Sequence, residues 1–187
     1  TNTYGATKLI DERLITATEL NKDNKTIFPS VRFGNVMGSR GSVIPLFKEQ
    51  ILRGKKITIT DRDMTRFMMT LQQATELTIK ALKEAKGGEV FVLKMPVINL
   101  GDLAEVLIDE ICERYGINKK DIDIEVIGLR PGEKMYEELM TYDESSIAWE
   151  LSDMYIIPGR INDKITYCNA KKASVGTYSS SSRAPLI

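Results

Sequence analysis

Apolar and polar residues alternate with two periodicities along this chain, one typical of helices and one typical of strands. Apolar residues recur every three or four positions in several segments bounded by glycine, proline or polar residues, which predicts helices. The predicted helices are 3–20, 43–52, 71–86, 101–115 and a short one at 133–140. The fourth has the clearest ends, with Asn99 as a possible cap and Gly116 as a stop.

Short runs of β-branched, aromatic or alternating apolar residues predict the strands. The predicted strands are 26–33, 56–60, 89–94, 122–126 and 154–157. Because strands alternate with helices, the sequence favours an α/β fold with a partly parallel sheet. The rest of the C-terminal part is expected to be irregular, and the serine run at 179–182 to belong to a mobile tail.

Composition narrows the class of protein. Hydrophobic residues make up 42% of the 187 residues and charged residues 28%, so the chain can build a core and is not a disordered tail. Lysine plus arginine equals aspartate plus glutamate, at 26 each, which gives no electrostatic case for binding nucleic acid or an anionic membrane. No apolar run is long enough to predict a membrane span.

The cysteine and histidine content limits the possible chemistry. The chain has no histidine, and its two cysteines, Cys112 and Cys168, are far apart in sequence. No zinc site is therefore expected, and buried thiols in a reducing cytoplasm are the simplest interpretation. Without histidine, acid–base chemistry falls to tyrosine, lysine, aspartate or glutamate.

Tyr4 and Lys8 are the candidate acid–base pair. Four residues apart in a helix, they lie on one face, and a lysine ammonium beside a phenol favours the phenolate. A tyrosine of this kind can exchange a proton with a substrate hydroxyl while hydride moves to a nicotinamide. The spacing alone is weak evidence, because it recurs at 115/119 and 167/171, which we interpret as chance.

Motifs around and after Tyr4 give the pair a context. Small residues follow the tyrosine in YGATK (4–8), and VRFGNVMG (31–38) comes after the predicted strand. This order resembles the extended short-chain dehydrogenase/reductases. The more specific stretches GSRGSVIP, TDRDMTRF and LRPGEK, at 38–45, 60–67 and 129–134, resemble the polysaccharide-biosynthesis branch. That branch comprises inverting UDP-N-acetylglucosamine 4,6-dehydratases and capsule-type 4-epimerases, and the resemblance runs from Tyr4 to about Tyr178.

The resemblance implies roles for individual residues. It implies NAD or NADP as cofactor and a UDP-sugar as substrate. A homo-oligomer is expected on other grounds, because loss of sheet neighbours would leave apolar surface exposed and favour self-association. Tyr4 and Lys8 match the catalytic pair, which also contacts the cofactor. The implied substrate-binding residues are Asn35, Ser42, Val43, Pro45, Arg66, Arg130 and Glu133. The two arginines would bind the diphosphate, since the planar guanidinium presents N–H donors in a geometry that suits phosphate oxygens.

Simpler interpretations stay open for these residues. Asn35 could cap a loop, Arg66 could be a solvated charge beside Asp61 and Asp63, and Arg130 could only pair with Glu133. Two further glutamates, Glu137 and Glu138, are expected on a solvated helix face without a role. The methionines, Met68-Met69 among them, are expected to fill the core.

The expected fold class is α/β, a partial Rossmann-like doubly wound sheet remnant with a small α/β substrate-binding region. Residues 1–34 and 71–95 would form the remnant of the dinucleotide-binding domain, 35–70 and 96–178 the nucleotide-sugar-binding region, and 179–187 a tail. The glycine-rich fingerprint G-x-G-x-x-G is absent from the sequence. The chain is therefore expected to be a C-terminal portion of such an enzyme, inactive alone.

Three functions remain open on the sequence alone. The first is UDP-N-acetylglucosamine 4,6-dehydration in polysaccharide or surface-glycan biosynthesis. The second is 4-epimerisation of UDP-glucose or UDP-N-acetylglucosamine, which shares the first oxidation at C4. The third is a non-catalytic sugar-nucleotide-binding or structural fragment.

Overall fold

The computed structural model describes residues 3–21, 23, 25–54, 56–159 and 167–182. The helices are α1 (Thr3–Asn21), α2 (Val43–Gly54), α3 (Leu71–Glu84), α4 (Leu100–Tyr115) and α5 (Tyr142–Ile147), with short 3-10 turns η1 (Lys119–Asp121) and η2 (Ser180–Ser182). The strands are β1 (Ser30–Arg32), β2 (Asn35–Val36), β3 (Lys56–Ile59), β4 (Thr65–Met69), β5 (Val90–Leu93), β6 (Val97–Asn99), β7 (Asp123–Val126), β8 (Glu138–Met140), β9 (Trp149–Glu150), β10 (Met154–Ile157), β11 (Lys171–Lys172) and β12 (Tyr178–Ser179).

These elements form two compact units, which are described separately. Unit 1 comprises Thr1–Gly34, Leu71–Met95 and Glu138–Ser179, and unit 2 comprises Asn35–Thr70, Pro96–Glu137 and Ser180–Ile187. The boundaries after 34, 70 and 95 are the same as those proposed from the sequence, but the assignment of the segments to a dinucleotide-binding remnant and a nucleotide-sugar-binding region stays a prediction. The segment Glu138–Ser179 differs, because it packs with unit 1 and not with the expected nucleotide-sugar region.

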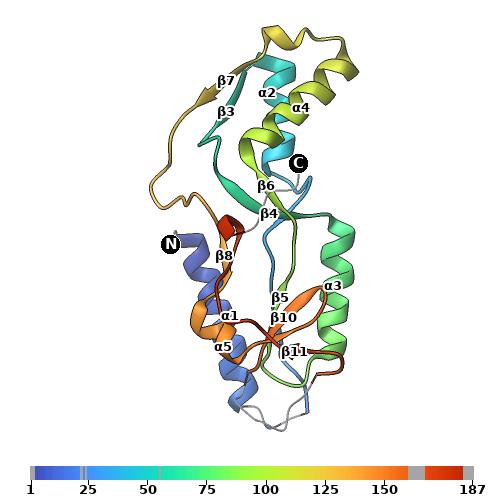
Figure 1. Cartoon of the computed structure of the whole chain (residues 1–187), viewed down its shortest axis with the longest axis vertical. Coiled ribbons are helices and arrows are strands. Elements are labelled where there is room, and N and C mark those ends of the chain that lie inside the picture. Colours follow the sequence, from blue (N-terminus) through green and yellow to red (C-terminus); the bar gives the residue numbers. More distant parts are fainter. Residues whose placement is uncertain (1–2, 22, 24, 55, 160–166, 183–187) are drawn as a thin grey trace. The chain divides into compact units, whose positions relative to one another are not determined.

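Unit 1 is built on a mixed sheet in the order β1-β5-β10-β9-β11. Strands β1 and β5 pair in parallel, with Val31 opposite Phe91, as the sequence predicted for 26–33 and 89–94. Strand β10 then adds antiparallel to β5. In the view of Figure 1, β5 and β10 lie between α1 and α3. The paired strand is shorter than predicted, since β1 covers only Ser30–Arg32.

A partly buried arginine connects three elements of unit 1. The guanidinium of Arg32, at the end of β1, donates to both carboxylate oxygens of Glu12 on α1, each at 2.7 Å. It also donates to Glu144 of α5 at 2.7 and 3.0 Å. Burial lowers the pKa of Arg32, but hydrogen bonds to the two carboxylates outweigh burial and raise it overall. The bidentate geometry therefore fixes α1 and α5 to the sheet edge.

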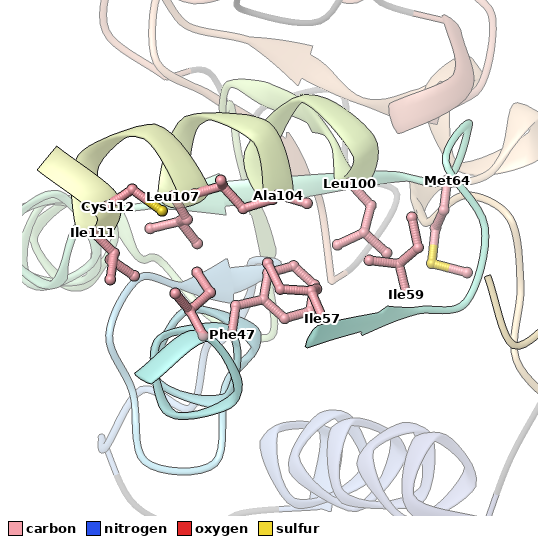
Figure 2. Packing of buried hydrophobic residues seen from close by; sticks show 11 residues of the cluster. Phe47, Ile57, Ile59, Met64, Leu100, Ala104, Leu107, Ile111 and Cys112 are labelled. Carbon is pink, nitrogen blue, oxygen red and sulfur yellow. The ribbon is translucent and has the colours of Figure 1, made fainter. Parts of the chain in front are cut away.

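Unit 2 has its own core between two helices and a strand pair. Helices α2 and α4 lie beside β3, which pairs in parallel with β7 (Figure 1). Figure 2 shows Leu100, Ala104 and Leu107 of α4 facing Phe47 of α2, with Ile57 and Ile59 of β3 completing the cluster. Phe47, Ile57 and Ile59 are fully buried, and each contributes about 1.5–3 kcal/mol of transfer free energy. A second sheet, β2-β4-β6, pairs Asn35 with Met68 and Phe67 with Val97.

Most long predicted elements are confirmed, and their local signals explain why. Helix α4 begins where Asn99 accepts hydrogen bonds from the N–H groups of Gly101 and Asp102, and ends at Gly116, whose φ of 66° is left-handed. The alternating pattern of β3 is confirmed, because Ile57 and Ile59 are both buried.

Two predictions at the C-terminal side are wrong. Residues 133–140 do not form a helix: a turn is followed by β8, which pairs antiparallel with β12. The serine run is not a tail within the described residues, because Ser179 and Ser180 are buried at 3% and 0% exposure. Of the two cysteines, Cys112 is buried as expected, whereas Cys168 is exposed. In the part of the chain described, no helix is both long and apolar enough to cross a membrane.

Asn99→Ala should lower the free energy of unfolding by about 1 kcal/mol, because two N–H groups at the start of α4 lose their acceptor. The matched control is Asn118→Ala, which removes the acceptor of the short turn η1 and should cost less. Urea denaturation of both variants measures the difference. Equal stability of the two variants would show that the Asn99 cap stabilises the protein no more than the Asn118 cap of η1.

Candidate functional site

Unit 2 contains a cavity of about 320 Å³, formed entirely by its own residues. Its wall is made by β2, the start of α2, β3, β4, β6 and the segment after β7. Many of the lining side chains are apolar, among them Val36, Ile44, Phe47, Ile59, Met64, Met68, Leu100 and Ile127. The volume lies in the range usual for small-molecule pockets, which combine apolar walls with a few placed polar groups.

Six of the seven sequence-predicted substrate-binding residues line this cavity. They are Asn35, Ser42, Val43, Arg66, Arg130 and Glu133. The seventh, Pro45, is absent from the cavity wall and occupies the third position of α2, where a missing N–H costs no helical hydrogen bond. The fold thus gathers four separated stretches of sequence around one space, and ligand contact by these residues stays a prediction.

Ser42 presents an unsatisfied hydroxyl at the start of α2. Its Oγ is buried and has no hydrogen-bond partner among the described residues, while its N–H donates to the carbonyl of Ser39 at 3.0 Å. The preceding Gly41 has a φ of 75°, a left-handed conformation that favours glycine and turns the chain into the helix. Since buried hydroxyls are usually paired, this Oγ fits a ligand group in the cavity.

Arg66, on β4, is largely committed to the protein. Its Nη1 donates to the carbonyls of Thr65 and Met135 at 2.7 and 3.2 Å, and its Nη2 donates to the carbonyl of Lys134 at 2.8 Å. Its side chain is only 18% exposed, so its interpretation as a solvated charge beside Asp61 and Asp63 is wrong. A guanidinium has five N–H donors, and three are already used. Arg66 can therefore offer fewer donors to a ligand than the sequence suggested.

Arg130 differs from Arg66 because, among the described residues, the N–H groups of its guanidinium are free. Its backbone N–H donates to Glu133 Oε2 at 3.2 Å, and Glu133 N–H donates back to its carbonyl at 2.9 Å. Among the described residues, however, its guanidinium has no hydrogen-bond or ion-pair partner. The turn through Pro131 and Gly132, whose φ is 82°, fixes the backbone. The pairing with Glu133, which was the simpler interpretation of Arg130, thus involves only the main chain of Arg130.

Glu133 is held on the cavity wall by two groups. Its Oε1 accepts from the hydroxyl of Thr60 at 3.2 Å, and its Oε2 accepts from Arg130 N–H. The sequence missed Thr60 and the apolar floor of the cavity, because these contacts join residues more than seventy positions apart. Only the periodicity of β3 signalled that Ile59 would face inward.

Glu137 is a second residue whose place the sequence missed. It lies in the segment before β8 rather than on a helix, and its side chain is 30% exposed. Its Oε2 accepts from Phe67 N–H at 3.1 Å, and the Asn35 amide favours the charged form of the same carboxylate. The expected solvated helix face is therefore wrong for Glu137, whereas Glu138 is exposed.

Tyr4 and Lys8 lie in unit 1, near the start of α1. The Lys8 Nζ is 5.7 Å from the centre of the Tyr4 ring and donates to Asp11 at 3.1 Å. The hydrogen bond and charge of Asp11 raise the pKa of the Lys8 ammonium, so Lys8 stays cationic at neutral pH. The Tyr4 side chain is 73% exposed, and its phenol is accessible from solvent.

The other two tyrosine–lysine pairs include residues that contact other parts of the protein. Tyr167 is buried and donates its hydroxyl to Glu89 at 3.0 Å, and burial together with that carboxylate raises the pKa of its phenol. Tyr115 ends α4, and Lys119 pairs instead with Asp109. Among the described residues, no group of three or more acidic or cysteine side chains is placed to hold a metal ion.

The architecture places the chain in a class of fold. Both units are α/β with parallel strand pairs, and the chain's neighbours among solved structures have the Rossmann-type fold of short-chain dehydrogenases/reductases. One neighbour is DesIV, a dTDP-glucose 4,6-dehydratase from Streptomyces venezuelae, with a TM-score of 0.59 at 18% identity over 71% of this chain and 40% of that one. Identity this low shows the fold alone.

The chain belongs to the polysaccharide biosynthesis protein family, whose profile matches residues 1–159. This confirms the resemblance inferred from the motifs. The X-ray structure of Pen from Bacillus thuringiensis is 62% identical, with a TM-score of 0.87 over 96% of this chain and 53% of that chain. An uncharacterized membrane protein of Methanocaldococcus jannaschii is 49% identical over 92% of this chain and 53% of its own length.

Relatives with named activities are more distant. UDP-N-acetylglucosamine 4,6-dehydratase (inverting) of Campylobacter jejuni is 37% identical over 83% of the chain and 44% of its own length. UDP-glucose 4-epimerase of Rickettsia canadensis is 40% identical over 84% of the chain and 44% of its own length. The chain thus spans about half the length of these relatives.

Proposed function

We propose that this chain forms the nucleotide-sugar-binding part of a NAD(P)-dependent UDP-N-acetylglucosamine 4,6-dehydratase of polysaccharide or surface-glycan biosynthesis. One observation carries the proposal: motif residues from separate stretches of sequence line a single cavity in unit 2. The cavity offers an apolar floor, the unpaired Ser42 hydroxyl and the free Arg130 fork. An apolar wall suits the faces of a base and ribose, and a guanidinium suits a diphosphate.

The proposed acid–base chemistry rests on Tyr4 and Lys8. Tyr4 takes the proton from the sugar C4 hydroxyl, and Lys8 keeps a positive charge one helical turn away. Loss of the C4 hydride to NAD or NADP would accompany this proton transfer and give a 4-keto sugar. The keto group would acidify C5 and permit loss of water across C5 and C6, and return of the hydride to C6 would give the 4-keto-6-deoxy product.

A nicotinamide cofactor fits the described residues in one respect. Tyr4 and Lys8 form an exposed phenol–ammonium pair, the donor set used beside a nicotinamide and its ribose. NAD or NADP, when bound, would supply the acceptor and donor of hydride. The sequence contains no glycine-rich dinucleotide fingerprint, so we assign no residue to the pyrophosphate.

A second candidate is 4-epimerisation of a UDP-sugar, favoured by the 40% identity to the Rickettsia epimerase. The cavity in unit 2 serves either reaction, because both begin from a bound UDP-sugar and a proton leaving the C4 hydroxyl. The product separates them in the catalytically competent protein: a 4-keto-6-deoxy sugar indicates dehydration, whereas inversion at C4 without loss of water indicates epimerisation. Self-association into a homo-oligomer remains a prediction.

Calorimetric titration of this chain with UDP-N-acetylglucosamine, UDP and UMP tests the binding part of the proposal. UDP-N-acetylglucosamine and UDP should bind, and UMP at least about tenfold more weakly, because it lacks the second phosphate that Arg130 would contact. ADP is the matched control for the base. Binding without turnover is expected for the chain alone, and no binding of any uridine nucleotide would contradict the proposal and favour a structural role.

A further inference from the structure

Glu137 occupies an unusual position for a surface glutamate. The cavity wall does not include it, yet its carboxylate contacts two residues that do. Its Oε1 is 3.9 Å from Arg66 Nε, and the Asn35 amide favours the charged form of the carboxylate. The N–H of Phe67, next to Arg66 in β4, donates to Oε2. One carboxylate thus interacts with residues of both β2 and β4 behind the cavity wall.

The main chain at Glu137 is fixed independently of its side chain. Its N–H donates to Ser180 Oγ at 2.9 Å, and its carbonyl accepts from Ser180 N–H, also at 2.9 Å. Ser180 is fully buried and its Oγ lies 3.1 Å from the Thr65 hydroxyl. Substitution of the Glu137 side chain therefore leaves the backbone anchored, so side-chain effects can be measured separately.

The carboxylate is costly to keep charged in this place. Burial raises the pKa of Glu137, and the Phe67 N–H, the Arg66 charge and the Asn35 amide offset only part of that effect. A carboxyl whose pKa is raised by folding favours the folded state when protonated, and this contribution is lost as pH rises through the raised pKa. At neutral pH, ionised Glu137 therefore opposes stability, which argues for a role other than holding the fold.

We propose that Glu137 is a positioning residue, which orients the Asn35 amide and the Arg66 guanidinium on the cavity wall for a nucleotide-sugar. The inference rests on the proposed function of the cavity. Arg66 has three donors fixed by main-chain carbonyls, and Glu137 faces its Nε side. Together these contacts set the plane of the guanidinium, so that the remaining Nη2 donor keeps one direction.

The decisive variant is Glu137→Gln. Glutamine Oε1 can keep the hydrogen bond from Phe67 N–H, but the neutral amide no longer attracts the Asn35 amide or the Arg66 guanidinium as a carboxylate does. The dissociation constant for UDP-N-acetylglucosamine should rise about tenfold, equivalent to about 1.4 kcal/mol. The melting temperature should stay the same or rise, since the buried charge is gone. Glu138→Gln, at the neighbouring exposed position, should change neither quantity.

A double-mutant cycle separates positioning from general damage. In a background with Asn35→Ala and Arg66→Ala, Glu137→Gln should change affinity by no more than about twofold, because its partners are gone. An undiminished effect, or a fall in melting temperature that accompanies the loss of affinity, would show a structural role and overturn the proposal. Equal affinity of wild type and Glu137→Gln would overturn it as well, while leaving the proposed function intact. No binding by wild type would overturn both.

A pH profile of the wild type decides the matter if Glu137→Gln does not fold. Lowering the pH from about 8 toward the ordinary titration range of glutamate should weaken UDP-N-acetylglucosamine binding, because the raised pKa makes Glu137 protonate before an ordinary glutamate does. The facing Asn35 and Ser180 carry no charge, and neither a guanidinium nor a diphosphate diester titrates in this range. Glu133 is the carboxylate on the cavity wall, so the loss should persist in Glu133→Gln. A flat wild-type profile would overturn the proposal.

Discussion

Tyr4→Phe should lower turnover of UDP-N-acetylglucosamine by about 10²–10⁴-fold in a protein that joins this chain to a dinucleotide-binding domain of its family. The phenol is the proposed proton acceptor, and phenylalanine keeps the ring without the hydroxyl. Because the Tyr4 side chain is 73% exposed, the change should leave the fold unaltered. Formation of the 4-keto product, followed by NMR, measures the effect, and circular dichroism checks the fold.

The chain supplies a matched control at Tyr115, which has a lysine four positions later and is also exposed. Tyr115→Phe should leave turnover unchanged, since Lys119 pairs with Asp109 and the tyrosine ends α4. Full activity of Tyr4→Phe would assign the proton transfer to another group and reduce the Tyr4–Lys8 spacing to coincidence.

Arg130→Ala should raise the dissociation constant of this chain for UDP-N-acetylglucosamine by about 10–150-fold, since a charge-assisted hydrogen bond contributes about 1.5–3 kcal/mol. Its guanidinium has no partner among the described residues, so the loss should appear in binding and not in stability. Calorimetry gives the affinity and thermal unfolding the stability. In a competent enzyme the same change should raise KM more than it lowers kcat, because diphosphate contacts are shared by ground and transition states.

Two further variants sharpen the Arg130 test. Arg130→Lys should recover only part of the affinity, because an ammonium cannot form the planar fork. Arg114→Ala removes an exposed arginine of unit 2 that pairs with Glu110 within α4, and it should bind the nucleotide-sugar like wild type. If Arg130→Ala binds as tightly as Arg114→Ala, Arg130 is a surface charge.

The elements that were predicted correctly are those with signals inside a short stretch of sequence. Helix α4 carries its cap at Asn99 and its stop at Gly116, and β3 alternates buried and exposed residues. The segment 133–140 failed because its glutamate, lysine and methionine residues favour a helix locally, whereas pairing of β8 with β12 favours a strand. That partner lies about forty residues further along, where no local signal reveals it.

Burial was less predictable than helix position. The period of α1 was correct, yet Leu9, Ile10 and Leu14 are 50–60% exposed, and Glu19 is its buried residue. A repeat of apolar residues specifies a helix and a face, but burial of that face depends on the surface packed against it. The buried Glu19 accepts a hydrogen bond from Phe28 N–H, a contact that composition cannot signal.

The candidate site was predictable as a set of residues and not as an arrangement. Motifs selected six side chains of one cavity, but gave Arg66 and Arg130 the same role. The structure separates them, because Arg66 is bound to three carbonyls and Arg130 has its fork free. Glu137 escaped prediction altogether, since its importance comes from contacts with Asn35 and Phe67, which are distant in sequence.

The most direct test of the central claim is an NMR titration of the isotope-labelled chain with UDP-N-acetylglucosamine. If the cavity of unit 2 binds the nucleotide-sugar, amide shifts should concentrate at Ser42, Val43 and the segment from Ile127 to Glu133. UDP should reproduce most of them, and Arg130→Ala should abolish them at the same ligand concentration. Shifts confined to unit 1, or none at saturating ligand, would contradict the assignment of this cavity as the nucleotide-sugar site.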